Sequence, residues 1–540
     1  MNQALMPTRI VTTCGNVLFP ENLLVPKPQQ AGFTDIGHTR IGQGGFVLLD
    51  FGREMRGGIV LTTCYPGSDD LIQSKLRARL VFGESVMEAL SSIGYKNATN
   101  DHAIRDTVID VPNMGNIRFG NTGFRFVKIE AIEGDLVLKA VRAESDIDER
   151  PYIGSFTCSD ERLNDIWRTG AYTVALNTGE YVWDGVKRDR LVWLGDMHPE
   201  TATIYAVYGA DPSIRRSLDL IKNETPSTQW INTLPSYSFW WVILQCEHYM
   251  HTGDLAYLRE QEAYMEVILQ RGYEVVCQNP TPKEFDFFVD WSSNADRGVA
   301  RVGFYAVLYK AFEAARHVAQ TLRNDRLCAL CENGKQRILA LALPIPQQKQ
   351  MAGIAAVAGI IDPKDANNTV LAVDPLAGLS TFMGYYVLLA RAKAGDTQGA
   401  LDIIRSYWGA MLDLGATTFW EDFDIDWCEN AGRIDEIVPE GKVDVHGDRG
   451  RFCYQQFRHS LCHGWAGGPT AFLSEHVLGV HIAEPGCQSL IIQPHLGDLA
   501  FARGTYPTPF GPVAIEHTRE GDRIVTHVDA PQEVSVRIET

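Results

Sequence analysis

The pattern of apolar and polar positions changes twice along the 540 residues of the chain. Over about the first 150 residues, short apolar runs alternate with polar positions at period two, as in "GFRFVKIEAIEG". Gly- and Asn-rich turns separate these runs. Alternation at this period is typical of strands that bury one face. Residues 1–152 are therefore predicted to form an N-terminal β-sandwich domain.

Helical spacing replaces the alternation in the middle of the chain. In "SFTCSDERLNDIWRTGAYTVALNTGEY", Ser159 is the expected N-cap, and Leu163, Ile166 and Trp167 fall on one helical stripe. Similar stripes, such as "DPSIRRSLDLIKNE" and "VGFYAVLYKAFEAARHVAQTL", follow up to about residue 480. Helices in such a series form a solenoid or a closed toroid, and no short repeat period favours the solenoid.

The β pattern returns after "EPG" at residues 484–486. The segments "SLIIQPHLG", "GPVAIEHTREGDRIVTHV" and "EVSVRIET" predict strands, with "REGDR" as a hairpin turn. The sequence thus predicts a multidomain protein. A helical domain over 153–483 is flanked by the β domain 1–152 and a small C-terminal β-sandwich domain over 484–540.

Composition narrows the class of partner and the compartment. The formal net charge is −18, which disfavours nucleic acid and anionic membranes as partners. The first twenty residues do not follow the pattern of a signal peptide, and no apolar window approaches a membrane span. The eleven scattered cysteines suit reduced thiols, and the Cys328/Cys331 pair suits ordinary helix packing better than zinc. We therefore expect a soluble, cytoplasmic protein.

One segment combines acids with tryptophans. "WDGVKRDRLVWLGDMHPE" holds Asp184, Asp189 and Asp196 close to Trp183 and Trp193. A salt-bridged surface loop explains the charges but not the aromatic residues. Flat apolar faces beside hydroxyl-binding carboxylates suit a sugar, whose ring stacks while its hydroxyl groups find fixed acceptors.

The same combination recurs at three later junctions between expected helices. These are "FDFFVDWSS" with Asp290 and Trp291, "GATTFWEDFDIDWCEN" with Trp420 and Glu421, and "FRHSLCHGWAGGPT" with His459, His463 and Trp465. Taken singly, each acid or histidine is more often structural than catalytic. If helix ends share one rim of a toroid, however, the segments converge on one concave site, which favours a carbohydrate enzyme.

Metal binding is the competing use of the acids. Asp422, Asp424 and Asp426 alternate as calcium ligands can, but the glycine and glutamate of an EF-hand loop are missing. The sequence also lacks a zinc-type His or paired CxxC pattern and a P-loop. We expect neither a metal ion nor a cofactor.

Three motifs together resemble glycoside hydrolase family 78, the α-L-rhamnosidases. The family's Asp-x-x-x-Arg-acid segment closing in Trp-x-Gly-Asp is similar to residues 184–196, its "TT-x-WE" segment to 417–421, and its "SLNH"-like segment to 460–463. The segments "LLDFGREMRGGIVL" and "EPGCQSLIIQPHLGDLAFARGTYPTPFGPVAIE" resemble its flanking β domains. Cys462 stands where the family usually has asparagine.

The resemblance implies a central (α/α)6 barrel over 153–483. It also implies an inverting, exo-acting α-L-rhamnosidase that releases terminal non-reducing α-L-rhamnose from small glycosides or oligosaccharides. Asp189 would be the general acid, although many members have the longer glutamate there, and Glu421 the general base. An inverting pair stands roughly 6.5–9.5 Å apart. The substrate-binding residues implied are Asp184, Arg188, Trp193, Asp196, Trp240, Asp290, Trp291, Trp420, His463 and Trp465.

Two other classes of function stay open at this stage. Another (α/α)6-barrel sugar enzyme, a phosphorylase or an unsaturated-uronide hydrolase, would use the same scaffold, and Lys187, Arg188 and Arg190 are its candidate phosphate ligands. A non-catalytic rhamnoside-binding protein is the other class. The sequence leaves open the aglycone and whether either arginine contacts Asp189. General frequency favours a homodimer.

Overall fold

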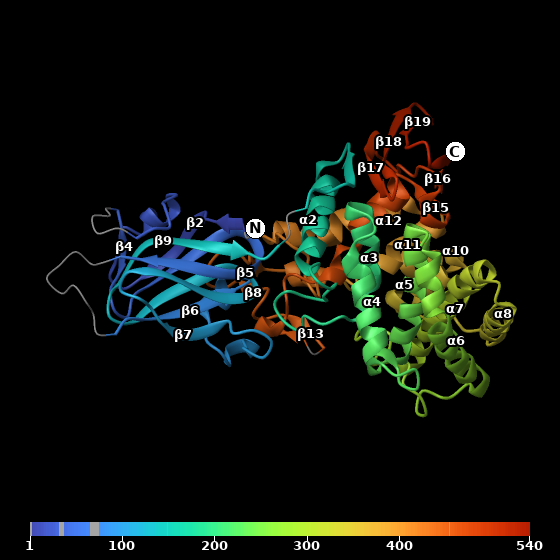
Figure 1. Ribbon diagram of the computed structural model, residues 1–540, viewed down its shortest axis with the longest axis horizontal. Coiled ribbons are helices and arrows are strands. Elements are labelled where there is room, and N and C mark those ends of the chain that lie inside the picture. Colours follow the sequence, from blue (N-terminus) through green and yellow to red (C-terminus); the bar gives the residue numbers. More distant parts are fainter. Residues whose placement is uncertain (1–2, 32–36, 65–74, 148–149, 453, 540) are drawn as a thin grey trace.

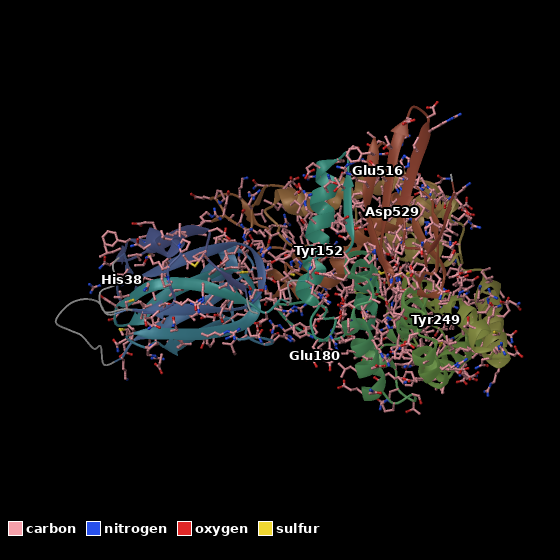
Figure 2. All side chains as sticks on the ribbon, turned by 45° about the horizontal axis from the view of Figure 1, so that its top comes forward. His38, Tyr152, Glu180, Tyr249, Glu516 and Asp529 are labelled. Atoms are coloured by element: carbon pink, nitrogen blue, oxygen red, sulfur yellow. The ribbon has the colours of Figure 1, made fainter. Side chains whose placement is uncertain are left out.

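Strands and helices separate in space along this chain. Figure 1 shows the N-terminal strands at one end of the molecule and the helices at the other, with the C-terminal strands packed on the helices. Figure 2 labels His38 beside the N-terminal strands and Glu516 and Asp529 on the C-terminal strands. The computed structural model describes residues 3–31, 37–64, 75–147, 150–452 and 454–539.

The N-terminal strands form one antiparallel sheet. Its path is β3-β4-β9-β5-β8-β6-β7, with β1 paired to β9 and β2 to β5. A short helix, α1 (Val86–Leu90), follows β6. The strands are β1 (Gln3–Leu5), β2 (Arg9–Cys14), β3 (Val17–Leu18), β4 (Thr39–Ile41), β5 (Phe46–Thr63), β6 (Arg77–Gly83), β7 (Asp106–Asp110), β8 (Gly115–Glu133) and β9 (Leu136–Ser145).

This sheet differs from the two separate sheets of a simple sandwich. The long strands β5 and β8 shift register between Asp50 and Met55, and β5 pairs with β2 before the shift and with β9 after it. A shift of this kind bends a strand, so two halves of one continuous sheet share the same strands. Leu49, Phe82 and Phe124 are fully or nearly fully buried in the resulting core.

The helical segment spans the predicted region. Its longest helix, α7, buries an almost continuous apolar stripe, as the period-3.6 pattern predicted. The helices are α2 (Glu161–Asn177), α3 (Leu194–Tyr208), α4 (Pro212–Glu224), α5 (Pro235–Thr252), α6 (Leu255–Gln278), α7 (Arg297–Leu322), α8 (Asp325–Ala340), α9 (Lys349–Ala358), α10 (Pro363–Ala366), α11 (Gly384–Lys393), α12 (Thr397–Ile403), α13 (Gly409–Asp413) and α14 (Gly468–Phe472).

The start of α2 corrects one sequence prediction. The N-cap is Asp160, whose side chain accepts a hydrogen bond from the Arg162 N–H, and not Ser159. The Ser159 hydroxyl instead accepts a hydrogen bond from the Ala500 N–H, 341 residues away. The serine is therefore used by the C-terminal strands, a contact that local capping rules do not reveal.

The C-terminal strands form two sheets. One has the order β15-β16-β20 and the other β10-β17-β18-β19. The predicted "REGDR" hairpin is confirmed, because Glu520 pairs with Arg523 across a two-residue turn in which Gly521 has φ +62°. The strands are β10 (Ser155–Cys158), β15 (Val480–Glu484), β16 (Ser489–Ile492), β17 (Phe501–Thr508), β18 (Gly511–Glu520), β19 (Arg523–Asp529) and β20 (Ser535–Ile538).

One C-terminal sheet contains a strand from before the helices. Strand β10 pairs antiparallel with β17, with Ser155 opposite Thr505. The chain thus passes through this sheet before it enters α2, and returns to it after α14. Both ends of the helical segment are thereby fixed to the same sheet.

The N-terminal sheet contacts the helical segment through buried hydrogen bonds. Arg56 donates to the Leu176 carbonyl at 2.7 Å, and Gly123 donates to the Val186 carbonyl at 3.0 Å. The Glu54 N–H donates to the Thr417 hydroxyl at 2.9 Å. These contacts lie at the end of α2, in the acid-rich loop and in the "TT-x-WE" segment. The sheet therefore supports the loops that carry the candidate site.

The ten cysteines that the structure describes are free thiols, and Cys331 of the CxxC pair is fully buried in the helical core. Among the described residues, no helix is both long and apolar enough to span a lipid bilayer.

Candidate active site

A cavity of about 480 Å³ opens where the acid-rich loop meets other helix junctions. Two-thirds of the predicted site residues line it, including the adjacent and oppositely charged Arg188 and Asp189 of the loop between α2 and α3. Those residues are Asp184, Arg188, Asp189, Trp193, Asp196, Trp291, His463 and Trp465. The predicted convergence of sequence-distant segments is therefore confirmed for this part of the set.

Glu421 lies in a small adjoining cavity. That cavity is also lined by Asp290 and shares Trp291, Tyr454 and Trp465 with the larger one. The shared aromatic residues join the two spaces. A groove of comparable size, about 490 Å³, lies on the C-terminal β10-β17-β18-β19 sheet. Its walls contain none of the buried carboxyl groups described here, so the chemistry concentrates at the helical cavity.

The acid-rich loop turns sharply at Asp189. Asp189 and Arg190 have φ values of +55° and +53°, a region that non-glycine residues rarely adopt. The Arg190 N–H closes the turn on the Arg188 carbonyl at 2.8 Å. Backbone strain of this kind persists where the surrounding contacts fix it, and it clusters at functional sites. Here the turn holds Asp189 at the cavity wall.

Arg188 links the two predicted catalytic carboxyl groups. Its Nη1 lies 3.2 Å from Asp189 Oδ1, and its Nη2 donates to Glu421 Oε1. Its Nε donates to the Arg458 carbonyl at 3.0 Å, and the guanidinium lies 4.0 Å from the centre of the Tyr454 ring. A guanidinium fork spans only a few ångströms, so the two carboxyl groups are at most about 8 Å apart.

Arg190 does not take part in this link. Its Nε donates to the Val186 carbonyl at 2.8 Å and its Nη1 to Asn121 at 3.1 Å. It also lies over the Trp183 ring. The question left open by the sequence is therefore answered: of the two arginines, Arg188 contacts Asp189.

Glu421 is completely enclosed. Its side chain has no solvent exposure, and Oε2 accepts a hydrogen bond from the Ser460 N–H at 3.0 Å. Burial raises the pKa of Glu421 to about 7, against the lowering effects of Arg188 and of the Ser460 N–H; Asp189 and Glu84 add to the rise. A carboxyl group with this pKa changes its charge near neutral pH, which is the range that a general base requires.

Backbone contacts fix the position of Glu421. Its carbonyl accepts hydrogen bonds from the Thr381 hydroxyl at 2.6 Å and from the Trp465 indole at 2.9 Å. Its N–H donates to the Ser460 carbonyl at 3.0 Å. Two separate segments thus hold one residue through three hydrogen bonds, so its carboxyl group is preorganised rather than free to move.

Asp184 and Asp196 are buried acids of a different kind. Burial raises the pKa of both groups well above the ordinary value, and neighbouring carboxyl groups add to the effect. Asp184 Oδ1 accepts from the Leu191 N–H at 2.9 Å, and Asp196 Oδ1 accepts from the Tyr237 hydroxyl at 3.1 Å. As protonated carboxyl groups both can donate and accept hydrogen bonds, which suits the hydroxyl groups of a sugar.

His463 faces two of these acids. Its Nε2 lies 3.5 Å from Glu421 Oε1 and 3.7 Å from Asp184 Oδ2. Burial, and secondarily Arg188, hold the pKa of His463 well below its usual range, so the ring is neutral. The ring packs on Trp465 with centroids 4.2 Å apart. His463 therefore offers a neutral polar edge beside an aromatic face.

Two of the predicted binding residues do not reach either cavity. Trp240 is fully buried between His198 and Tyr386, and Trp420 is buried against Phe423. Neither lines the described cavities. Trp240 lies within the apolar helix α5, whose buried face it extends. A structural explanation accounts for its position.

Several cavity residues were not predicted. His102 comes from the loop before β7, far along the chain from the acid-rich loop, and Tyr237 comes from the first turn of α5. Asn232, Tyr454 and Arg458 also belong to this group. Tyr454 and Arg458 lie just before the "SLNH"-like segment, so extending that motif upstream finds them. His102 stands in no motif, and its sequence gives no such signal.

The described residues contain one cluster with metal-binding geometry. It consists of Glu84, Glu88 and His446. Two cations already occupy its surroundings, because Lys187 Nζ lies 2.9 Å from Glu88 and 3.3 Å from Glu84, and Arg105 lies 3.2 Å from Glu88. These ion pairs supply the positive charge that a metal ion would bring.

The alternating acids considered for calcium have another partner. Arg451 lies 2.9 Å from Asp422 and 2.7 Å from Asp424. Asp426 takes part in neither ion pair and lies in the short helix Ile425–Cys428, where its N–H donates to the N-cap Asp424. Asp422 and Asp424 therefore form ion pairs with Arg451, and these ion pairs fix the loop that follows Glu421.

Comparison with known proteins finds similarity to α-L-rhamnosidases. An α-L-rhamnosidase of Alteromonas sp. (strain LOR) is 25% identical over 468 residues, which cover 76% of this chain and 48% of that protein. A GH78 family rhamnosidase structure from Bacillus sp. GL1 superimposes with a TM-score of 0.73 at 20% identity, covering 96% of this chain and 55% of the other. A rhamnosidase from Klebsiella oxytoca with rhamnose bound has a TM-score of 0.69 at 18% identity, covering 88% and 96%.

Two family models match parts of the chain. The bacterial alpha-L-rhamnosidase 6 hairpin glycosidase domain matches residues 151–338, and the bacterial alpha-L-rhamnosidase C-terminal domain matches 479–539. These two segments are similar to domains of the bacterial α-L-rhamnosidases, and the solved rhamnosidase structure of glycoside hydrolase family 78 shares the fold of the chain. The rhamnosidase match includes Asp184, Asp189 and Asp196, whereas Glu421 and His463 lie outside both matched ranges. The chain spans about half the length of the Alteromonas rhamnosidase.

Proposed function

We propose that the protein is an exo-acting α-L-rhamnosidase that hydrolyses terminal α-L-rhamnose from small glycosides or oligosaccharides with inversion. One observation carries the proposal: Arg188 holds Asp189 and Glu421 on its two arms at a cavity wall. Glycoside hydrolysis needs two carboxyl groups flanking the scissile bond. The similarity of residues 151–338 to a bacterial α-L-rhamnosidase domain supports rhamnose as the sugar.

Glu421 is the proposed general base. Its pKa of about 7 lets it accept a proton from water near neutral pH, and Arg188 stabilises the carboxylate form before the reaction. His463 and the Ser460 N–H border the same carboxyl group. These contacts orient the group toward one face, as water activation requires.

Asp189 is the proposed general acid. It lines the larger cavity, and both of its contacts among the described residues go to Oδ1. The other oxygen, Oδ2, is left to donate a proton to the leaving glycosidic oxygen. Aspartate is shorter than glutamate, and its backbone here lies in a left-handed turn at the cavity wall.

Asp184, Asp196 and His463 bind the hydroxyl groups of rhamnose in this proposal, and Trp291 and Trp465 stack on the ring and its methyl group. A neutral set of donors suits a neutral sugar, because no ionic group is left unpaired when the substrate excludes water. The cavity volume of about 480 Å³ falls in the range of small-ligand sites and accommodates a monosaccharide with part of its aglycone.

We further propose that the helical segment 153–483 is an (α/α)6 barrel between a β domain over 1–152 and another over 484–540. The series of helices from α2 to α14 supports this division, as does the position of the site loops at helix junctions. In this scheme β10 crosses into the C-terminal domain's sheet from the start of the barrel.

The phosphorylase alternative lacks its anion site. Lys187 is buried and pairs with two glutamates and the His459 carbonyl, and Arg188 is committed to Glu421. Arg190 donates to a backbone carbonyl and an asparagine. None of the three cations proposed for phosphate is available in the cavity, which favours hydrolysis.

The test is a panel of 4-nitrophenyl glycosides. We expect release of 4-nitrophenol from the α-L-rhamnoside only, independent of added phosphate, and its loss in Asp189→Asn and Glu421→Gln. Asp426→Asn is the matched control, because Asp426 is an exposed acid five residues from Glu421. Rhamnose binding without turnover would favour the non-catalytic alternative, and near-wild-type rates in both variants would refute the assignment of the pair.

A further inference from the structure

A residue of the N-terminal sheet region reaches the proposed general acid. His102 lies in the loop between β6 and β7 and lines the cavity, with its side chain 28% exposed. Its Nε2 is 3.2 Å from Asp189 Oδ1. No helical-segment residue other than Arg188 makes a comparable contact with this carboxyl group among the described residues. The contact crosses from one structural region to another.

The chemistry of the contacts fixes the direction of donation. Arg188 can only donate, so Asp189 Oδ1 is an acceptor. The other acceptor near His102 Nε2 is Asp101 Oδ2, at 3.4 Å. A nitrogen placed between two carboxylate oxygens carries a proton, because a lone pair there would be repelled. His102 therefore donates through Nε2, and Oδ1 of Asp189 receives two donors.

Two donors on one oxygen decide where the acid's own proton resides. Oδ1 is occupied by the N–H groups of Arg188 and His102, so the carboxyl proton is confined to Oδ2. In a general acid only that oxygen is useful, because it must point at the glycosidic oxygen. After the proton leaves, the same two N–H groups stabilise the carboxylate that remains.

The loop that carries His102 is anchored to the helical segment on the same side of the cavity. Asp101 pairs with Arg458 at 2.9 Å, and Asn97 donates to Gln456 at 2.9 Å. Lys96 donates to Asp448. These three contacts limit movement of the loop that leads into His102. The position of His102 is thus set by the fold and not by a free surface side chain.

On the basis of the proposed rhamnosidase function, we propose that His102 is a positioning residue that orients Asp189 as the general acid, so that the N-terminal sheet region completes the active site. The shorter aspartate needs this second donor, because Arg188 is shared with Glu421 and cannot fix Asp189 alone. The role concerns protonation of the leaving group and not binding of the sugar.

The experiment compares kcat for two substrates with the intact chain: methyl α-L-rhamnoside, which needs a proton on its leaving oxygen, and the 2,4-dinitrophenyl rhamnoside, which needs almost none. In His102→Ala we expect kcat for the methyl glycoside to fall about 10- to 100-fold, as part of the contribution of general acid catalysis. For the dinitrophenyl glycoside we expect a change of less than about threefold.

A second variant and a control separate positioning from structural damage. His102→Gln keeps an N–H donor near the position of Nε2 and should restore most of the methyl glycoside rate. Asn294→Ala removes another cavity residue, one with no contact to Asp189, and should leave the ratio of the two rates unchanged. Melting temperatures of all variants show whether each is folded.

Equal losses on both substrates in a folded His102→Ala enzyme would overturn the inference, as would an unchanged ratio or a His102→Gln enzyme as impaired as the alanine variant. If His102→Ala does not fold, the glutamine variant decides by the same ratio. Failure of the wild-type enzyme on both rhamnosides is a separate outcome, because it refutes the proposed function itself.

Discussion

Replacing Arg188 with methionine removes the cation that faces Glu421. Glu421 has a pKa of about 7 although burial raises it, because Arg188 and the Ser460 N–H oppose that rise. At about 4 Å and an effective dielectric constant of ~20, one opposite charge contributes ~4 kcal/mol. Since one pKa unit corresponds to ~1.4 kcal/mol, loss of Arg188 raises the pKa of Glu421 by up to about three units.

The direction of the pH dependence of kcat/KM follows from the role of Glu421 as a base. Glu421 must be unprotonated to activate water, so kcat/KM rises with pH through its pKa; this rise is the acid limb of the profile. We expect the limb near pH 7 in the wild-type enzyme and near pH 9–10 in Arg188→Met. At pH 7 the variant therefore loses about 50- to 500-fold in kcat/KM from protonation alone, because the wild-type base is itself about half protonated there.

The assay is kcat/KM for an aryl α-L-rhamnoside from pH 4 to 10, since this parameter reports groups of the free enzyme. Arg188→Lys keeps a charge near Glu421 and should move the limb by about one unit or less. Arg190→Met is the matched control, because Arg190 donates to Val186 and Asn121 instead. An unmoved limb in Arg188→Met, or a wild-type limb near pH 4.5, would refute the reasoning.

Three further predictions test the surroundings of the pair. Glu84→Gln should lower the free energy of unfolding in urea by ~3 kcal/mol and lower kcat about tenfold. The reason is that the buried Glu84 carboxylate accepts hydrogen bonds from Ser460 and Leu461, which lie beside Glu421. A kcat equal to that of the wild type would contradict this connection between Glu84 and Glu421. Trp291→Ala should raise KM about tenfold with kcat little changed, since stacking is uniform binding; a selective fall in kcat would contradict this. Asp184→Asn should lessen the fall of stability as pH rises above about 4. The pKa of Asp184 is raised in the folded state, so the folded protein keeps a proton there that the unfolded chain loses. Urea unfolding at pH 5 and 8 measures the fall, and an equal fall in wild type and variant would contradict the prediction.

The order of β, helical and β segments was predictable because each has its own period along the chain. The helix 212–224 and the hairpin at "REGDR" follow from local rules alone. Strand β10 does not, because its partner β17 lies more than 340 residues away. For the same reason Ser159 was misassigned as an N-cap, although Asp160 next to it satisfies the same rule.

The site residues also divide into those that a local sequence pattern reveals and those that depend on distant contacts. Asp184, Asp189 and Asp196 were found because acids beside tryptophans are costly without a function, and their motif lies within thirteen residues. Trp240 was misjudged, because an aromatic residue inside an apolar helix is most simply a core residue. His102 was missed because its meaning depends on a contact between the loop before β7 and the turn at Asp189, which no local pattern encodes.

The central claim is that Asp189 and Glu421 act as an acid and a base across one sugar, with water attacking from the side opposite the leaving group. The most direct measurement is proton NMR of an aryl α-L-rhamnoside during hydrolysis, recorded before the released sugar equilibrates. The account predicts that β-L-rhamnose appears first and the α-anomer follows by mutarotation. First appearance of α-L-rhamnose would show retention and contradict the assignment of Glu421 as a base.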